Sequence, residues 1–180
     1  MRITIRHGVL TDATALAELA ARTFRDAFGA DNRPEDMALH MALAYGMPQQ
    51  QAELADPRLV TLLVEVDGRL AGYAQLRSGL APACVIGERP IELWRFYVDR
   101  AWHGQGVAQA LMERVDAEAV GRGARTLWLG VWERNPRAMA YYRKTGFVDF
   151  GSHVFMVGTD GQTDRIMARP LPAAPSSASA

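Results

Sequence analysis

The segment whose residue types point most directly to chemistry is HGQGVA, which runs from His103 to Ala108. Its glycines, Gly104 and Gly106, let the backbone come close to a ligand. Consecutive N–H groups that lead into a helix form an anion site, which the helix dipole reinforces. A strand-like run precedes the segment and a helix-like run follows it, so the pattern predicts a phosphate-binding turn. A glycine-rich connection without a ligand is the alternative.

A dinucleotide-binding turn is another interpretation of these glycines, because Gly-x-Gly after a strand is part of that fingerprint. Glu133 also ends the next strand-like run, where a ribose-binding acid would lie. However, Gln109 stands at the third glycine position, and the motif begins late in a chain of 180 residues. A P-loop fits less well, since neither Lys-Ser nor Lys-Thr follows the glycines.

A second motif, NPRAMAYYRKTGF, runs from Asn135 to Phe147. Asn135 is a good N-cap, Pro136 suits the first helical turn, and Gly146 suits the left-handed position after the helix. Asn135 and Tyr142 recur at helical spacing and therefore share one helix face. Tyr142 is either a core aromatic or a phenol that is presented to a ligand.

Apolar periodicity places both motifs in a series of strands and helices. Thr11 and Asp12 are expected to cap the first helix with their side-chain oxygens, and Asp67-Gly68 predicts a tight hairpin. Roughly seven strands and four or five helices result, which is an α/β sheet of mixed direction with helices on its faces. The series comprises strand 3–6, a helix ending near 28, helices starting near 34 and 48, the hairpin strands 59–66 and 69–77, strand 91–98, helix 106–120, strand 126–132, helix 135–144, and strands 147–157 and 165–169.

Composition limits the function classes. The chain is 49% hydrophobic and 22% charged with a formal net charge of zero, so no overall field attracts it to nucleic acid or to a membrane surface. Cys84 is the only cysteine, which excludes an intramolecular disulfide and a thiolate-rich metal site. We expect one domain over residues 1–169, a disordered Pro/Ala/Ser tail over 170–180, a cytoplasmic location and no metal. Oligomeric state is open, and a homodimer is one option.

The two motifs together resemble the GCN5-related N-acetyltransferase family. That family's loop, (Gln/Arg)-x-x-Gly-x-(Gly/Ala), is matched at His103, Gly106 and Ala108, with His103 departing from the usual Gln or Arg. Its second motif is matched without departure at Asn135, Ala138, Tyr142, Gly146 and Phe147. Within the family, the segments ELWRFYV, HGQGVAQALM and LWLGVWERN look most like bacterial spermidine/spermine N-acetyltransferases.

The resemblance implies a mixed, mostly antiparallel central sheet with helices on both faces. It also implies an enzyme that transfers the acetyl group of acetyl-CoA, its co-substrate, to a primary amine. The glycine-rich loop would hold the pyrophosphate, and the pantetheine arm would pair with the strand that contains Val98, whose N–H would stabilise the carbonyl oxygen. The implied cofactor-binding residues are Phe96, Tyr97, Val98, His103, Gly104, Gln105, Gly106, Val107, Ala108, Asn135 and Tyr142.

For the chemistry, Tyr142 is the predicted acid for the leaving thiolate, since its ordinary pKa is about 10. Glu92 is the predicted base, acting through water; an exposed strand carboxylate without a role is the alternative. Phe28, Glu35, Trp94 and Trp132 are expected around the acceptor.

The acceptor is expected to be a small cationic amine such as a polyamine. In enzymes of this type the segment that corresponds to residues 24–56 tends to cover the acceptor groove. Here it carries Asp26, Asp31, Glu35, Asp36, Glu53 and Asp56 against Arg25 and Arg33. Solvated helix faces would explain these acids equally well. Other options are an acetyltransferase of an amino acid or a peptide N-terminus, and a non-catalytic acyl-CoA-binding regulatory domain.

Overall fold

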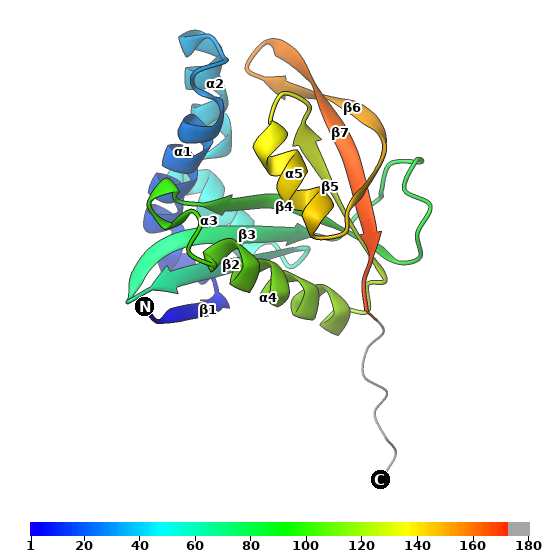
Figure 1. Cartoon of the computed structure of the whole chain (residues 1–180). Coiled ribbons are helices and arrows are strands. Elements are labelled where there is room, and N and C mark those ends of the chain that lie inside the picture. Colours follow the sequence, from blue (N-terminus) through cyan, green and yellow to red (C-terminus); the bar gives the residue numbers. More distant parts are fainter. Residues whose placement is uncertain (173–180) are drawn as a thin grey trace.

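The computed structural model describes residues 1–172. Its strands are β1 (Ile3–His7), β2 (Leu59–Val66), β3 (Arg69–Arg77), β4 (Pro90–Val98), β5 (Thr126–Trp132), β6 (Val148–Val157) and β7 (Asp160–Pro170). Its α-helices are α1 (Ala13–Phe28), α2 (Pro34–Ala44), α3 (Met47–Ala55), α4 (Val107–Gly121) and α5 (Pro136–Lys144). The strands form one sheet in the order β1-β2-β3-β4-β5-β7-β6 (Figure 1), in which β4 and β5 pair in parallel and the other neighbours are antiparallel. The predicted fold class is confirmed.

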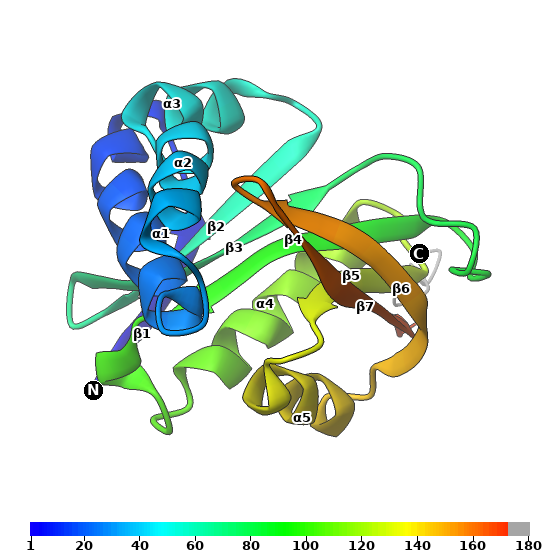
Figure 2. The same ribbon diagram turned by 90° about the horizontal axis from the view of Figure 1, so that it is seen from above.

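Helices cover both faces of the sheet (Figure 2). The apolar run of β2 shows why, since its neighbours Leu62 and Leu63 point to opposite faces and are both fully buried. Leu62 packs in the core that includes Leu111 of α4, and Leu63 packs in the core that includes Phe24 of α1. The sheet therefore lies between α4 and α5 on one side and α1 to α3 on the other.

The sheet opens between its two parallel strands. β4 pairs with β5 only from Pro90 to Glu92, opposite Thr126 to Trp128, and the two strands then diverge. Beyond Glu92, the edge of β4 that faces β5 has no strand partner. The strands thus form a V whose closed end lies at Glu92.

A β-bulge at Trp94 reorients the open half of β4. Leu93 lies opposite Leu76 and Arg95 lies opposite Gln75, so Trp94 has no residue across from it. Such an extra residue exchanges the faces to which the following side chains point. Arg95 consequently turns toward α3, where its Nη1 lies 2.5 Å from Oε2 of Glu53.

Two local predictions were wrong. β7 begins at Asp160 instead of residue 165, because Val157 pairs with Asp160 and only two residues form the hairpin turn. The side chain of Asp12 does not cap α1: its carboxylate accepts hydrogen bonds from the Val9 N–H and from Arg6, each at 2.8 Å or less. Asp12 thus stabilises the turn that precedes the helix.

The predicted tail overlaps the domain at its start. Pro170 ends β7, and Leu171 is buried, with its N–H donating to the Arg125 carbonyl at 2.8 Å. Residues 173–180, the remainder of the predicted tail, lie outside the described residues. Within residues 1–172, no helix is both long and apolar enough to cross a membrane.

Candidate active site

Two cavities of about 500 Å³ each adjoin at the V between β4 and β5. The first cavity lies among α1, α2, β4, β5 and the β6–β7 hairpin. The second cavity lies among α1, β4, the start of α4 and α5. Five residues line both cavities: Phe96, Tyr97, Asn135, Ala138 and Tyr142. A molecule in one cavity can therefore meet a molecule in the other at these side chains.

The glycine-rich loop borders the second cavity and offers free N–H groups. Gly104 and Gly106 have φ values of 76° and 82°, which side chains rarely adopt, and a Cβ at either position would meet no atom within 4 Å. The first hydrogen bond of α4 runs from the Ala110 N–H to the Gly106 carbonyl, so the N–H groups just before it remain available. The open backbone fits a phosphate group.

The loop side chains have structural roles. His103 Nε2 lies 2.8 Å from the Val98 carbonyl oxygen, and Gln105 donates to the Ala101 carbonyl at 2.8 Å. Val107 is fully buried, so only its backbone is presented. The loop thus offers its backbone, while its side chains hold it against β4.

The free edge of β4 carries the backbone of Val98. The neighbouring Asp99 N–H donates to Ala71 in β3, at 2.8 Å. Because successive N–H groups of a strand point to opposite sides, the Val98 N–H points toward the open side of the V. The predicted pairing with a pantetheine arm requires this orientation.

Tyr142 of α5 lies at the junction of the cavities. Asn135 Oδ1 accepts from the Ala138 N–H at 3.0 Å, so this cap fixes where the helix begins. The Tyr142 ring packs edge-on against Phe96 and Phe147. Burial, reinforced by the neighbouring Tyr141, raises the pKa of Tyr142 well above its ordinary value, so the phenol is neutral at physiological pH.

Tyr141 was missed by the sequence analysis. Its hydroxyl donates to the Ala108 carbonyl at 3.0 Å, and its ring stacks on Phe96. This residue connects α5 to the glycine-rich loop and to β4. The motif contains two adjacent tyrosines, and only the tertiary structure distinguishes their environments.

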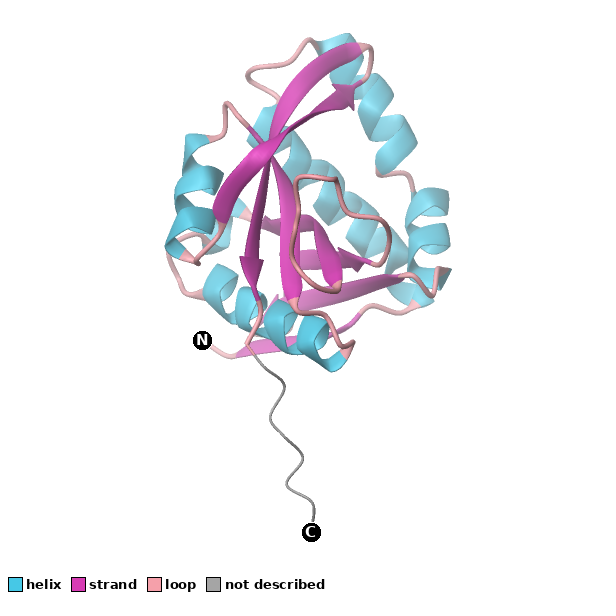
Figure 3. Cartoon of the chain, turned by 90° about the vertical axis from the view of Figure 1, so that its right-hand side faces the viewer, coloured by secondary structure: helices cyan, strands magenta, loops and turns pink. Residues whose placement is uncertain are grey.

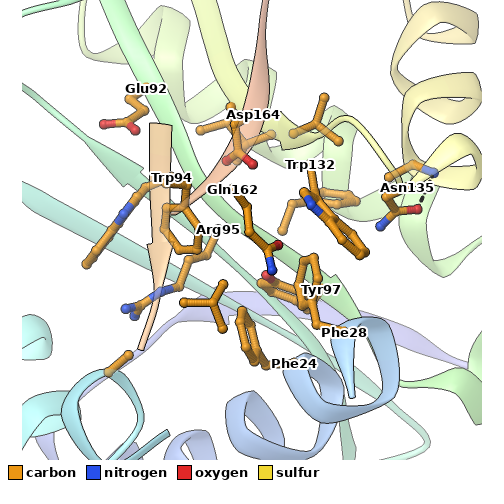
Figure 4. Close-up of a pocket in the computed structure, with 18 of the residues that line it drawn as sticks. Phe24, Phe28, Glu92, Trp94, Arg95, Tyr97, Trp132, Asn135, Gln162 and Asp164 are labelled. Carbon is orange, nitrogen blue, oxygen red and sulfur yellow. Dashed lines mark hydrogen bonds between the residues drawn. The ribbon is translucent and has the colours of Figure 1, made fainter. Parts of the chain in front are cut away.

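Aromatic side chains form the walls of the first cavity (Figure 4). Phe28 packs on Trp132 with ring centroids 5.4 Å apart, and the guanidinium carbons of Arg77 and Arg95 lie 4.4 and 3.9 Å from the Trp94 ring. Phe28, Trp94 and Trp132 thus lie where an acceptor could bind. Glu35 does not: it is exposed on α2 and is not among the residues that line either cavity, which corrects that prediction.

Two carboxylates line the first cavity. Glu92 lies at the closed end of the V, and its Oε2 accepts from Arg77 Nε at 2.8 Å. Asp164 of β7 lies opposite Trp132 and His153, and burial raises its pKa to about 6. Asp164 falls in a stretch that was expected to be a loop, and no motif marks it. The sequence analysis therefore missed it.

Two histidines, His40 and His153, also line the first cavity. The His40 ring stacks on Phe24 at 4.6 Å, and burial lowers its pKa. His153 Nε2 lies 3.8 Å from Asp164 Oδ2. The neighbourhood of Asp164 thus includes a titratable ring on the adjacent strand.

Three of the six acids in the predicted acidic surface are neutralised by ion pairs. Asp36 pairs with Arg33, Glu53 pairs with Arg95, and Asp56 pairs with Arg58. Asp26 lines the second cavity, not the first. These contacts weaken the charge argument for a polycationic acceptor.

Comparisons with known proteins agree with this geometry. The sequence model of the Acetyltransferase (GNAT) family matches residues 14–147. An uncharacterized N-acetyltransferase of Mycobacterium tuberculosis is 38% identical over 162 residues, which are 90% of this chain and 99% of that protein. The ribosomal protein bS18-alanine N-acetyltransferase of Escherichia coli is 37% identical over 116 residues, or 63% of this chain and 73% of that protein.

A solved structure gives the same fold. PaiA N-acetyltransferase from Thermoplasma acidophilum, in complex with coenzyme A, superposes with a TM-score of 0.78 at 21% identity and covers 94% of this chain and 99% of that one. The predicted co-substrate, acetyl-CoA, is confirmed by the family. None of these three proteins is named for a polyamine. The chain belongs to the GNAT family and is an acetyl-CoA-dependent N-acetyltransferase.

Proposed function

We propose that the chain acetylates a small primary amine that binds in the first cavity while acetyl-CoA occupies the second. The observation that carries this proposal is the set of residues common to both cavities, with Phe96 and Tyr142 among them. A cavity of about 500 Å³ lies within the range typical of small-molecule sites. The V between β4 and β5 then serves as the passage for the acetyl group.

The chain's backbone holds the co-substrate in this proposal. Acetyl-CoA supplies the acetyl group as a thioester. The loop from Gly104 to Ala108 binds the pyrophosphate through N–H groups, and the Val98 N–H donates to the thioester oxygen. Such a fixed donor stabilises the negative charge that this oxygen gains during transfer.

Tyr142 assists departure of the sulfur. The sequence analysis assigned it as a full proton donor with a pKa of about 10. Burial raises that pKa well above its ordinary value, whereas a free thiol titrates near 8.5, so complete transfer from the phenol to the thiolate is unfavourable. The hydroxyl therefore acts mainly by donating a hydrogen bond to the sulfur as negative charge develops there.

The role of Glu92 as the base stays a prediction. Its carboxylate lies in the first cavity, which favours the role, but it is already bonded to Arg77 at 2.8 Å. The guanidinium of Arg77 therefore occupies one of the two carboxylate oxygens of Glu92.

Hydrogen bonds join the β6–β7 hairpin to the start of α2, and this connection limits the size of the acceptor. The N–H and hydroxyl of Thr159, at the tip of the β6–β7 hairpin, each donate to Asp36 Oδ1 at 2.8 Å, and Gln162 donates to Asn32. Figure 3 shows this hairpin reaching toward the helices. The two hydrogen bonds from Thr159, with the bond from Arg33, hold the pKa of Asp36 below its usual range. The enclosure favours a slender amine over a long chain laid across the site.

The finer identity of the amine has two candidates. Aromatic walls and the Asp164 carboxylate suit an alkylammonium group, as in a polyamine. Similarity to the ribosomal protein bS18-alanine N-acetyltransferase favours instead the α-amine of a protein N-terminus.

The experiment is an acceptor panel with acetyl-CoA, scored by release of free thiol. Spermidine, a short alkyl monoamine and a peptide that begins with alanine are compared at equal concentration. Turnover of the small amines supports the proposal. Turnover of the peptide alone would assign the protein-terminus alternative, and release of thiol at the same rate without any amine would contradict amine acetylation.

A further inference from the structure

We propose that Asp164 binds the ammonium group of the acceptor and takes its proton, a role that rests on the proposed function. Asp164 is 9% exposed, lies on β7 between Trp132 and His153, and lines the first cavity. In Figure 4 its carboxylate points toward the space between Trp94 and Trp132. Neither the motifs nor the family resemblance assigns a function to this residue.

The polar contacts of Asp164 are incomplete. Its Oδ1 atom is buried and has no hydrogen-bond partner among residues 1–172. A buried carboxylate oxygen without a donor is costly, so a ligand that supplies one binds favourably. An ammonium group supplies up to three donors and an opposite charge. Glu92, by contrast, already accepts from Arg77 at 2.8 Å.

Gly130 keeps the carboxylate accessible. Gly130 lies on β5 and lines the first cavity. A Cβ at this position would lie 3.2 Å from Asp164 Oδ2 and 3.3 Å from His153 Nε2. Any side chain at position 130 would therefore make close contacts with Asp164 and His153. Because Gly130 has no side chain, there is room for an amine beside Asp164.

The surroundings set the proton affinity. Burial raises the pKa of Asp164 to about 6, and the electrostatic interaction with His153 on β6 opposes this rise. The adjacent positions on β5, Gly130 and Trp132, carry no charge. The same cavity is lined by Glu92, Arg77, Arg95 and His40. At neutral pH Asp164 is thus mostly ionised, yet it is a stronger base than an ordinary aspartate.

With Asp164 as the base, both protons that the acceptor nitrogen loses are accounted for. The ammonium group gives one proton to Asp164, which then releases it to solvent. The partly exposed His153 lies beside Asp164. The freed amine forms a bond to the acetyl carbon as the bond from that carbon to sulfur breaks. Sulfur leaves with the electron pair and receives the second proton lost by nitrogen. The products are the amide, the free thiol and one proton.

The experiment compares the pH dependence of kcat/KM for an alkyl monoamine that the wild-type enzyme acetylates. An enzyme that binds the ammonium form and uses ionised Asp164 gives a plateau from about pH 6 to about pH 10, where the amine itself titrates. Asp164→Asn can use only the neutral form of the amine. Its kcat/KM should therefore be lower than that of the wild type by about 10²- to 10⁴-fold at pH 7, and it should rise about tenfold per pH unit. Asp160→Asn, an exposed carboxylate on the same strand, is the matched control.

Coenzyme A affinity, measured by calorimetry, should be equal in the wild type and in Asp164→Asn, because Asp164 does not line the second cavity. Asp164→Glu should restore the plateau at a reduced rate. Parallel pH profiles for Asp164→Asn and wild type would overturn the assignment. So would loss of the plateau in Glu92→Gln with the plateau retained in Asp164→Asn.

Failure of this assignment is separable from failure of the proposed function. If the wild type acetylates no amine, the proposed function fails. If the wild type acetylates the amine and the profile does not depend on Asp164, only the inference fails. Should Asp164→Asn not fold, the Asp164→Glu variant and the ¹³C-carboxyl titration of Asp164 in the wild type decide: a carboxyl that titrates near 4 contradicts the assignment.

Discussion

Nε2 of His103 lies 2.8 Å from the carbonyl oxygen of Val98, so the first residue of the glycine-rich loop is bonded to the strand that lines both cavities. The family pattern has Gln or Arg at this position. In this chain the ring fixes the loop relative to β4, and the loop backbone is left to bind the phosphates. The contact explains how the departure from the family motif is accommodated.

His103→Ala should weaken coenzyme A binding about 2- to 12-fold, because one net hydrogen bond is worth about 0.5 to 1.5 kcal/mol. Calorimetric titration with coenzyme A measures the change. His7→Ala is a matched control, since that exposed ring bonds to Glu118 at 2.9 Å, away from both cavities. Equal affinity of His103→Ala and wild type would show that the contact does not organise the loop.

Gly106→Glu should abolish detectable coenzyme A binding, because it places a negative charge where a phosphate belongs. Gly121→Glu is the control, since a Cβ there also meets nothing within 4 Å. Gly106→Asn separates the effect of the added charge from that of backbone strain, because asparagine tolerates the left-handed conformation and adds no charge. Retention of affinity in Gly106→Glu would refute the loop assignment.

Tyr142→Phe should lower kcat about 10- to 150-fold with little change in coenzyme A affinity, since a hydrogen bond to a charged group is worth about 1.5 to 3 kcal/mol. Tyr141→Phe, at the neighbouring tyrosine, is the comparison variant. That variant loses the bond to Ala108 and should weaken coenzyme A binding more than it lowers kcat. Unchanged turnover in Tyr142→Phe, with chemistry limiting the rate, would leave Tyr142 as a core aromatic only.

The raised pKa of Asp164 also predicts a stability effect. The folded value of about 6 exceeds the unfolded value of about 3.9, so the stabilisation is full below the unfolded pKa and is lost as pH rises through about 6. Two pKa units correspond to about 3 kcal/mol. Asp164→Asn should therefore gain stability relative to wild type between pH 4 and pH 8, measured by urea unfolding. A constant difference over that range would show that the pKa is not raised.

The sequence predicted the fold well at positions where the residue type itself favours one local structure. The glycines of the loop, the Asn135 cap and the two-residue hairpin turn at Asp67-Gly68 all follow from the sequence alone. The start of β7 did not, because the polar residues from Asp160 onward become a strand only through pairing with β6. The bulge at Trp94 was also unpredictable, since it depends on the register of β3 against β4.

The chemistry of the acceptor side was harder to predict for a related reason. Acids between residues 24 and 56 looked like an open acidic surface, but Asp36 and Glu53 are bonded to Arg33 and Arg95 in the folded chain. Asp164 carried no motif, and its importance comes from burial without a hydrogen-bond partner for Oδ1. Ion pairing and desolvation arise from contacts between distant segments, which spacing along one strand or helix does not reveal.

The central claim is that acetyl transfer occurs where the two cavities meet, between β4 and β5. A crystal structure with a bisubstrate compound, in which the sulfur of coenzyme A is joined through an acetyl linker to a short alkylamine, tests it most directly. The account predicts the pyrophosphate at Gly104 to Ala108, the linker between Val98 and Tyr142, and the amine nitrogen beside Asp164. Density for the alkylamine outside the first cavity, with coenzyme A in place, would contradict the account.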